Sequence, residues 1–128
     1  MKVLVDTAAF WWLALESQKL STTALQVFDD PVNELLLSPV VVWELLVKHT
    51  IGKLKVTEPI QDVLARARAS RAFVPWPLAE SAVLHLPSLP PVHRDPFDRL
   101  LICQALDANA TILTPDAAIR VYPVSSLW

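Results

Sequence analysis

The chain has 128 residues, a formal net charge of −2, one glycine and one cysteine. Hydrophobic residues make up 53% and charged residues 19%, so we expect a single folded domain spanning residues 1–128 rather than a disordered chain. Gly52 as the only glycine excludes Rossmann dinucleotide-binding proteins, P-loop NTPases and α/β-hydrolases, because their loops each need more than one glycine in a short span.

The apolar stretches are too short and too interrupted for a membrane protein, which needs about 20 uninterrupted apolar residues per span. Asp6 interrupts the only segment that could serve as a secretory leader. Cys103 has no second cysteine with which to form a disulfide or a cysteine-based zinc site, which agrees with a reducing compartment. We therefore expect a cytoplasmic protein with no membrane association.

The first half of the chain alternates between strand and helix patterns. Caps support two of its helices, because Ser21 precedes one and the pair Ser38-Pro39 begins another in the favoured order of serine cap and first-turn proline. In chain order we expect a strand over Lys2 to Val5, a helix over Thr7 to Leu15, a helix over Ser21 to Phe28, a strand over Leu35 to Leu37 and a helix from Ser38 to about Ile51, ended by Gly52.

The second half repeats the alternation with shorter elements. Asp95-Pro96 begins a helix in the same manner as Ser38-Pro39. We expect helices over Pro59 to Ser70, Leu78 to Leu84 and Asp95 to about Asp107, short strands over Phe73-Val74 and Thr111 to Leu113, a short helix from Thr114-Pro115 and a last extended segment over Val121 to Leu127. Strands alternating with helices predict an α/β fold with a parallel sheet covered on both faces.

Four acidic residues follow or lie near the ends of the predicted strands, where α/β proteins bind their ligands. They are Asp6, Glu44, Asp98 and Asp116. Each also has a purely structural interpretation: Asp6 as a helix cap, Asp98 as the partner of the capping Asp95, Asp116 in a first helical turn and Glu44 on a solvated helix face. Taken one at a time, the structural interpretations are the better ones.

Helical phase favours a joint explanation for two of these acids. Glu44 shares a stripe with Val40, Val47 and Ile51, with Lys48 beside it, which is an unfavourable place for a solvated glutamate. Asp98 shares the face of Leu101, Ile102 and Ala105, whereas Arg99 points away. Both carboxylates are therefore predicted to face inward at the same edge of the sheet.

Several carboxylates in one place repel strongly and require a cation among them. Two unit charges about 4 Å apart repel by roughly 4 kcal/mol at an effective dielectric constant of about 20. Oxygen ligands without cysteine or suitably spaced histidine favour Mg²⁺, or Mn²⁺, over zinc. The residues thus predict a magnesium site formed by Asp6, Glu44, Asp98 and Asp116.

The residues around these acids resemble those of the PIN-domain ribonucleases, and specifically the VapC-type toxins of bacterial toxin–antitoxin pairs. The resemblance runs over essentially the whole chain. It rests on four segments, Val3-Leu4-Val5-Asp6-Thr7, Ser38 to Lys48 centred on Trp43-Glu44, His93 to Ile102 with the sequence HRDPFDRLLI, and Leu113-Thr114-Pro115-Asp116. It implies an α/β/α sandwich with a parallel central sheet, Mg²⁺-dependent endoribonuclease activity, an antitoxin partner and usually a homodimer.

By position, Asp6, Glu44, Asp98 and Asp116 match the acidic site of that family, and Thr7 and Thr114 match its hydroxyl neighbours. We assign Asp95 to helix capping because it precedes Pro96. The implied chemistry is attack of metal-activated water on an RNA phosphodiester, leaving 5′-phosphate and 3′-hydroxyl ends. The alternative from another class is a PIN-like module that binds a protein partner without cutting.

Basic and aromatic residues supply further candidates. Without the four site acids, eleven basic residues face nine acidic ones, so the remaining surface is mildly basic. Lys48, Arg94 and Arg99 lie beside the acidic segments and are candidates for phosphate contacts, with local pairing as the alternative.

Three adjacent aromatic residues, Phe10, Trp11 and Trp12, cannot all face one core, so at least one should be exposed or in an interface. Trp43, Trp76 and Trp128 are expected in the core. His49, His85 and His93 show no metal-ligand spacing and are expected to be structural, with His93 also considered for substrate contact.

Overall fold

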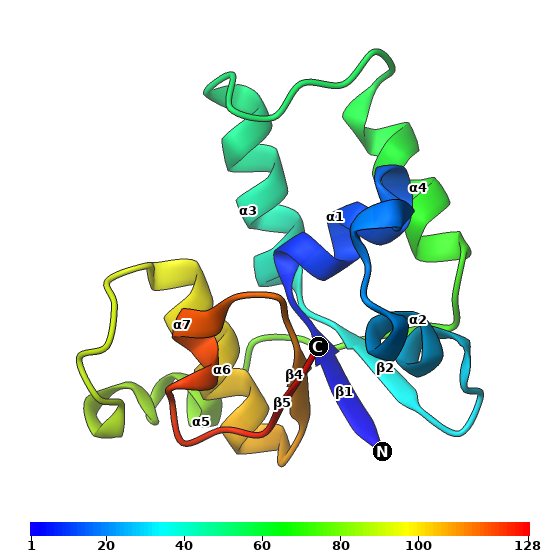
Figure 1. Cartoon of the computed structure of the whole chain (residues 1–128). Helices are drawn as coiled ribbons and strands as arrows, with labels where there is room; N and C mark the ends of the chain where they lie inside the picture. The colour runs from blue at the N-terminus through cyan, green and yellow to red at the C-terminus, as the bar shows by residue number, and fades with distance from the viewer.

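The computed structural model describes residues 1–128 and contains a five-stranded, all-parallel sheet (Figure 1). The strand order is β3-β2-β1-β4-β5, so the first strand of the chain lies at the centre. The strands are β1 (Lys2–Val5), β2 (Glu34–Leu37), β3 (Phe73–Pro75), β4 (Thr111–Leu113) and β5 (Ser126–Leu127). The expected α/β class and parallel sheet are confirmed.

Seven α-helices connect and cover the strands. In Figure 1, α1, α2 and α4 lie on one side of the sheet, α5 and α6 lie on the other, and α3 extends beyond the carboxyl ends of the strands. The helices are α1 (Thr7–Leu15), α2 (Thr22–Asp29), α3 (Pro39–Thr50), α4 (Ile60–Ala69), α5 (Glu80–Val83), α6 (Pro96–Ala108) and α7 (Ala117–Arg120), with short 3₁₀ helices at Ser17–Lys19 and Leu86–Ser88. None of them has the length and apolar composition needed to span a bilayer.

The core is built on strands that are apolar on both faces, as expected where helices cover a parallel sheet on both sides. Val3, Leu4 and Val5 in β1 are completely buried or nearly so, and Leu35 to Leu37 of β2 and Ile112 and Leu113 of β4 are buried in the same way. On one side, the ring of Phe10 in α1 meets Phe73 of β3 edge to face, with 5.5 Å between ring centroids. Helices α1 and α3 begin almost directly after β1 and β2, so the residues that start these two helices lie at the carboxyl ends of the strands.

A buried polar pair joins the start of α3 to α6. Ser38 caps α3 through the amide of Val40, and its hydroxyl also donates a hydrogen bond to the side-chain carbonyl of Gln104 in α6. The Gln104 amide in turn donates to the backbone carbonyl of Trp76, 3.3 Å away. Since both side chains are fully buried, these bonds fix the start of α3 relative to α6.

The structure corrects three expectations. The short helix does not start at Thr114-Pro115, because the Asp116 amide donates to the Thr114 hydroxyl in a turn, and Asp116 is the N-cap of α7. In the segment after Val121, only Ser126 and Leu127 form a strand. Trp43 is 62% exposed rather than in the core, because α3 extends past the sheet and only one of its faces is covered.

Gly52 occupies the conformation predicted for a helix C-terminal glycine, with φ of +79°. A Cβ at this position would meet no atom within 4 Å, so only the backbone opposes substitution. We expect Gly52→Ala to lower the free energy of unfolding by about 1 kcal/mol and the Tm by a few degrees. Gly52→Asn, which tolerates positive φ better, should lose less; thermal melts in which the alanine variant matches the wild type would contradict this.

Candidate active site

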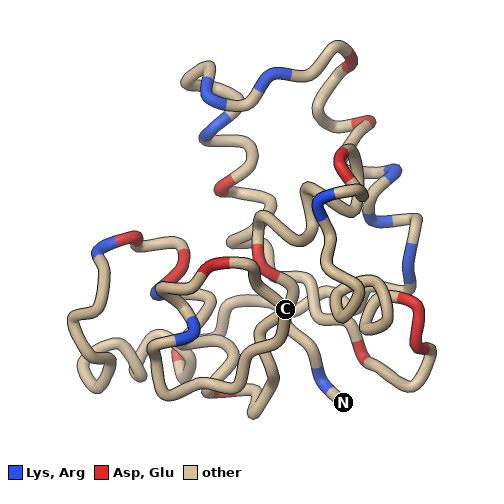
Figure 2. The backbone as a smooth tube through the Cα atoms, in the orientation of Figure 1, with Lys and Arg blue, Asp and Glu red and all other residues tan.

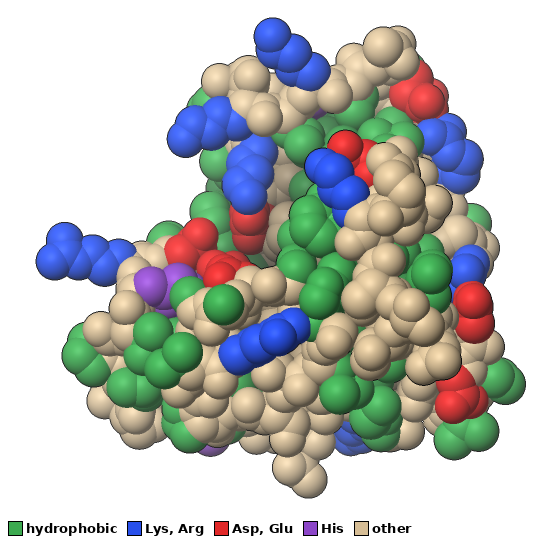
Figure 3. Space-filling view, viewed as in Figure 1, with side chains coloured by type: hydrophobic (Ala, Val, Ile, Leu, Met, Phe, Trp, Pro, Cys, Tyr) green, Lys and Arg blue, Asp and Glu red, His purple; other side chains and the backbone are tan.

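The structure brings the four predicted acids into one cleft of about 320 Å³ at the carboxyl ends of the strands. Asp6 follows β1, Glu44 lies in α3, Asp98 lies in the first turn of α6 and Asp116 caps α7. Figure 2 shows acidic positions on several separate segments of the backbone, and the space-filling view shows acidic side chains gathered in a hollow with basic side chains around it (Figure 3).

Asp6 caps α1 and also lies in the cleft. Its carboxylate accepts a hydrogen bond of 2.7 Å from the Ala9 amide and so caps α1, yet it also lines the cleft. Burial, reinforced by the negative charges of Asp98 and Glu44, raises its pKa to about 7, and hydrogen bonds from the Thr114 hydroxyl and the Ala9 amide only partly oppose this. Asp6 is therefore a carboxyl group whose ionised form is poorly stabilised by the protein alone.

Asp95 and Asp98 divide two roles between them. The Asp95 carboxylate accepts hydrogen bonds from the amides of Phe97 and Asp98, as expected for the N-cap of α6. Asp98 faces the imidazole of His93, with 3.2 Å between Nε2 and the carboxylate. Burial and the nearby Asp95 charge raise the pKa of Asp98 to about 6, against the lowering effect of His93. The inward face predicted for Asp98 is confirmed.

Glu44 is only 3% exposed, which confirms its predicted inward orientation, although Ile51 of the same stripe is exposed at the helix end. The Thr7 hydroxyl donates to one of its carboxylate oxygens at 2.8 Å, and the Lys48 ammonium contacts the other at 2.6 Å. The Lys48 ammonium thus balances part of the negative charge of the four clustered carboxylates, and Lys48 lines the same cleft. Lys48 therefore both pairs with Glu44 and lies in the cleft.

His93 belongs to the cleft more closely than its sequence position suggested. Ligand atoms of His93, Asp98 and Asp116 all lie within 4.8 Å of one another, a spacing suited to a metal ion. The other ring nitrogen of His93 lies 2.8 Å from the Tyr122 hydroxyl, which fixes the orientation of the imidazole. The expectation that no histidine is suitably placed for a metal is therefore wrong for His93, because it lies in a loop whose course the sequence pattern does not predict.

The two arginine candidates lie differently from Lys48. The Arg99 guanidinium donates to the Tyr122 hydroxyl at 2.9 Å and to the Pro90 carbonyl at 3.0 Å, which holds it away from the acids. Arg94 is exposed on the loop before α6 and does not line the acidic cleft. Tyr122, which holds both His93 and Arg99, was missed because a lone tyrosine in an irregular segment carries no sequence signal for such a role.

The three adjacent aromatic residues of α1 differ in exposure, as expected for side chains that cannot all face one core. Phe10 is in the core, Trp11 is 8% exposed, and Trp12 is partly exposed. Trp11 and Trp12 both line the acidic cleft. The indole of Trp12 also packs against Trp128 at the end of the chain, with 5.8 Å between ring centroids.

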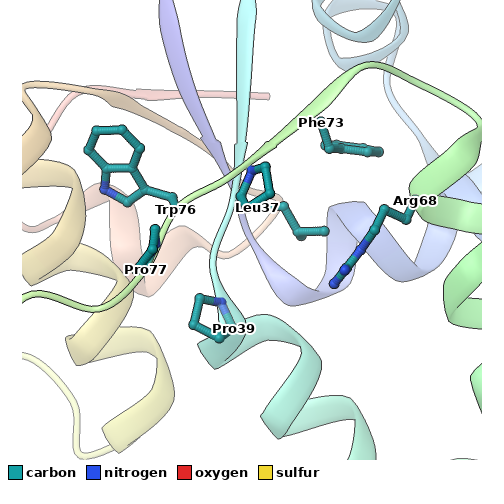
Figure 4. A pocket seen from close by; sticks show the side chains of 7 residues that line it. Leu37, Pro39, Arg68, Phe73, Trp76 and Pro77 are labelled. Atoms are coloured by element: carbon teal, nitrogen blue, oxygen red, sulfur yellow. The ribbon is translucent and has the colours of Figure 1, made fainter.

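A second pocket, of about 250 Å³, lies where β2 and β3 end, and its only charged residue is Arg68 (Figure 4). The other residues that line it are Leu37, Pro39, Phe73, Pro75, Trp76 and Pro77. Without a carboxylate, a hydroxyl or a histidine, this pocket offers no acid–base or metal chemistry. The acidic cleft is therefore the candidate active site.

A central β1 strand flanked by β2 and β4, with acids at the carboxyl ends of the strands, defines an α/β/α protein with a carboxylate site at one sheet edge. Residues 3–124 match the family model described as the PIN domain. The chain belongs to the PIN domain family. Among curated proteins, none matches this sequence significantly.

Solved structures share the fold at low sequence identity. VapBC2 from Rickettsia felis, bound to a DNA fragment from its promoter, matches with a TM-score of 0.73 and 17% identity over 99% of this chain and 98% of that chain. VapBC-1 from nontypeable Haemophilus influenzae gives 0.59 and 16% over 99% and 97%. FitAcB from Neisseria gonorrhoeae gives 0.52 and 13% over 98% and 96%. These likenesses support the fold.

The raised pKa of Asp6 predicts a pH dependence of stability. The folded protein holds this proton more tightly than the unfolded chain, so the stability it contributes is complete below about pH 4 and is lost as the pH rises through about 7. In EDTA, Asp6→Asn should therefore gain stability relative to wild type between pH 4 and pH 8, by at most about 4 kcal/mol. Urea unfolding at several pH values measures this.

Glu34→Gln, at an exposed carboxylate on β2, provides the matched control and should follow the wild-type profile. Parallel profiles for Asp6→Asn and wild type would show that the Asp6 carboxyl ionises normally in the folded protein.

Proposed function

We propose that this protein is a divalent-metal-dependent endoribonuclease, the toxin of a toxin–antitoxin pair. The observation that carries the proposal is the meeting of Asp6, Glu44, Asp98 and Asp116 in one cleft at the carboxyl edge of the sheet. Two of these carboxyls have raised pKa values, which is typical of sites that await a cation or a proton. Membership of the PIN family and the shared fold with VapBC assemblies support the same function.

The donor set fits a divalent ion. Burial disfavours the ionised forms of Asp6 and Asp98, and a cation between them would restore those forms. Asp6, Asp98 and Asp116 would hold the ion directly or through water, and Glu44 would either ligate it or orient the attacking water. Oxygen donors favour Mg²⁺, while the nitrogen of His93 beside Asp98 and Asp116 makes Mn²⁺ an acceptable substitute.

The chain's own residues determine how a phosphodiester would lie in the cleft. A divalent ion, when bound, lowers the pKa of water and polarises phosphoryl oxygens. Thr7 fixes the Glu44 carboxylate, and Lys48, whose side chain is 44% exposed, can reach a substrate phosphate from that position. Arg99 is excluded from such a contact by its bonds to Tyr122 and Pro90. Hydrolysis at this site leaves a 5′-phosphate and a 3′-hydroxyl.

The partners in this proposal are an RNA substrate, a cognate antitoxin and a second copy of the chain. Two of the matched structures are VapBC complexes, which supports an antitoxin as a partner of this chain. The alternative function is that of a catalytically silent PIN-like module that binds its partner without cutting RNA. The observation that favours it is the Glu44–Lys48 ion pair, because a carboxylate already paired with an ammonium group is less available to a metal ion.

Cleavage of RNA by the purified protein distinguishes these two functions. In millimolar Mg²⁺ or Mn²⁺ we expect cleavage that EDTA abolishes, and we expect Asp6→Asn to reduce the rate at least 100-fold while the protein stays folded, because asparagine still caps α1. Gel analysis of a structured RNA, with circular dichroism of the variant, provides the measurement. A folded Asp6→Asn protein with full activity would contradict the enzymatic function.

The neighbouring acids of α6 provide a matched pair of variants. Asp95 binds two backbone amides, a role that asparagine performs well, whereas Asp98 faces the cleft and His93. We expect Asp95→Asn to retain substantial activity and Asp98→Asn to lose nearly all of it. Initial rates under identical metal concentrations decide the matter, and the reverse order would show that Asp95 is the functional acid.

A further inference from the structure

The acidic cleft has two unlike walls. Asp95, Asp98 and Asp116, from the starts of α6 and α7, form the acidic wall. The other lining comes from Asp6, α1, α3 and the segment after α3; beside the paired Thr7 and Glu44 it presents an apolar and aromatic surface. Its residues are Trp11, Trp12, Leu45 and Leu54, with Lys48 beside them.

Trp12 presents a partly exposed indole to the cleft, and neighbouring side chains hold this indole in place. Its indole meets Trp128 at an interplanar angle of 62°, and the Lys19 ammonium lies 5.5 Å from the centre of its ring. Unlike Phe10 and Trp11, which are buried, Trp12 remains partly exposed beside charged groups. The indole is therefore held in place without being removed from the cleft.

An occupant that satisfies both walls carries an anionic group and a flat aromatic group a short distance apart. A nucleotide unit of RNA has both, and base–aromatic stacking is available to every base because each has a π-face. We propose that Trp12 stacks on a nucleobase next to the cleaved phosphodiester and so helps to determine where single-stranded RNA is cut. This inference rests on the proposed function and adds a substrate-binding residue to it.

Positively charged residues near Trp12 could bind the phosphates of an RNA strand. Lys53 and Lys55 are exposed on either side of Leu54, and no acidic residue lies between Glu44 and Glu58. The amides of Lys53 and Leu54 both donate to the Lys48 carbonyl, at 2.9 and 3.2 Å, which ties this basic segment to the end of α3. Backbone phosphates of a strand stacked on Trp12 would thus meet positive charge beyond the cleft, where Figure 2 shows a basic stretch.

The experiment compares an RNA oligonucleotide that has one mapped cleavage site with copies in which single bases flanking that site are replaced by abasic ribose. For wild type, removing the stacked base should lower kcat/KM by about 5- to 150-fold at one position. For Trp12→Leu, the ratio of kcat/KM between intact and abasic RNA should fall close to one at that position, and Trp12→Phe should retain an intermediate ratio. Because each ratio compares two substrates of one variant, a loss of folded enzyme does not affect it.

Trp43→Leu is the matched control, since Trp43 is 62% exposed on α3 outside the cleft, and its ratio should equal that of wild type. If Trp12→Leu does not fold, Trp12→Met replaces it as the non-aromatic variant. An unchanged ratio in the non-aromatic variant overturns the inference, including the case in which the variant instead loses binding of a protein partner. Absence of RNA cleavage by wild type overturns the proposed function, and this inference with it.

Discussion

Mutual repulsion among carboxylates at one edge of the sheet is the constraint on which the rest of the structure depends. A parallel sheet delivers the carboxyl ends of β1, β2 and β4 to the same edge, and acids follow there in a space partly closed to water. Helix N-termini offset part of the resulting cost. The carboxylates of Asp6, Asp95 and Asp116 each accept hydrogen bonds from amides at the start of a helix, where the helix dipole also favours negative charge.

Glu44 is stabilised by different means. It lies beyond the first turn of its helix, so no free helix amide is available, and Thr7 and Lys48 take that place. The Thr7–Glu44 bond joins α1 to α3. The Ser38–Gln104 bond joins the start of α3 to α6, so α3 is held at both places. Backbone amides thus stabilise the carboxylates of Asp6, Asp95 and Asp116, whereas two side chains, those of Thr7 and Lys48, stabilise the carboxylate of Glu44. Under the proposed function, a substrate phosphate would compete with Glu44 for that ammonium group.

Most of the fold and the convergence of the acids were predictable because they depend on local rules. Serine and aspartate before proline fix the starts of α3 and α6, and apolar runs fix β1, β2 and β4. Helical phase was sufficient to orient Glu44 and Asp98. It did not predict that Trp43 is exposed, because phase orients a side chain but does not reveal where a helix leaves the sheet. His93 and Tyr122 approach the site from irregular segments, whose course depends on tertiary contacts such as the Arg99–Tyr122 bond.

The overlap of capping and site residues explains why single acids were ambiguous in the sequence. An aspartate that caps a helix at the end of a parallel strand is placed by its structural role at the edge where ligands bind, so the two interpretations do not exclude each other. The two interpretations can be separated by how well hydrogen bonds and nearby charges stabilise each ionised carboxylate. Asp95, with two amide donors, is satisfied by the protein, whereas Asp6 and Asp98 retain raised pKa values despite their hydrogen bonds. Under the proposed function, Asp6 and Asp98 are therefore the carboxyls whose ionised forms a bound cation would stabilise most.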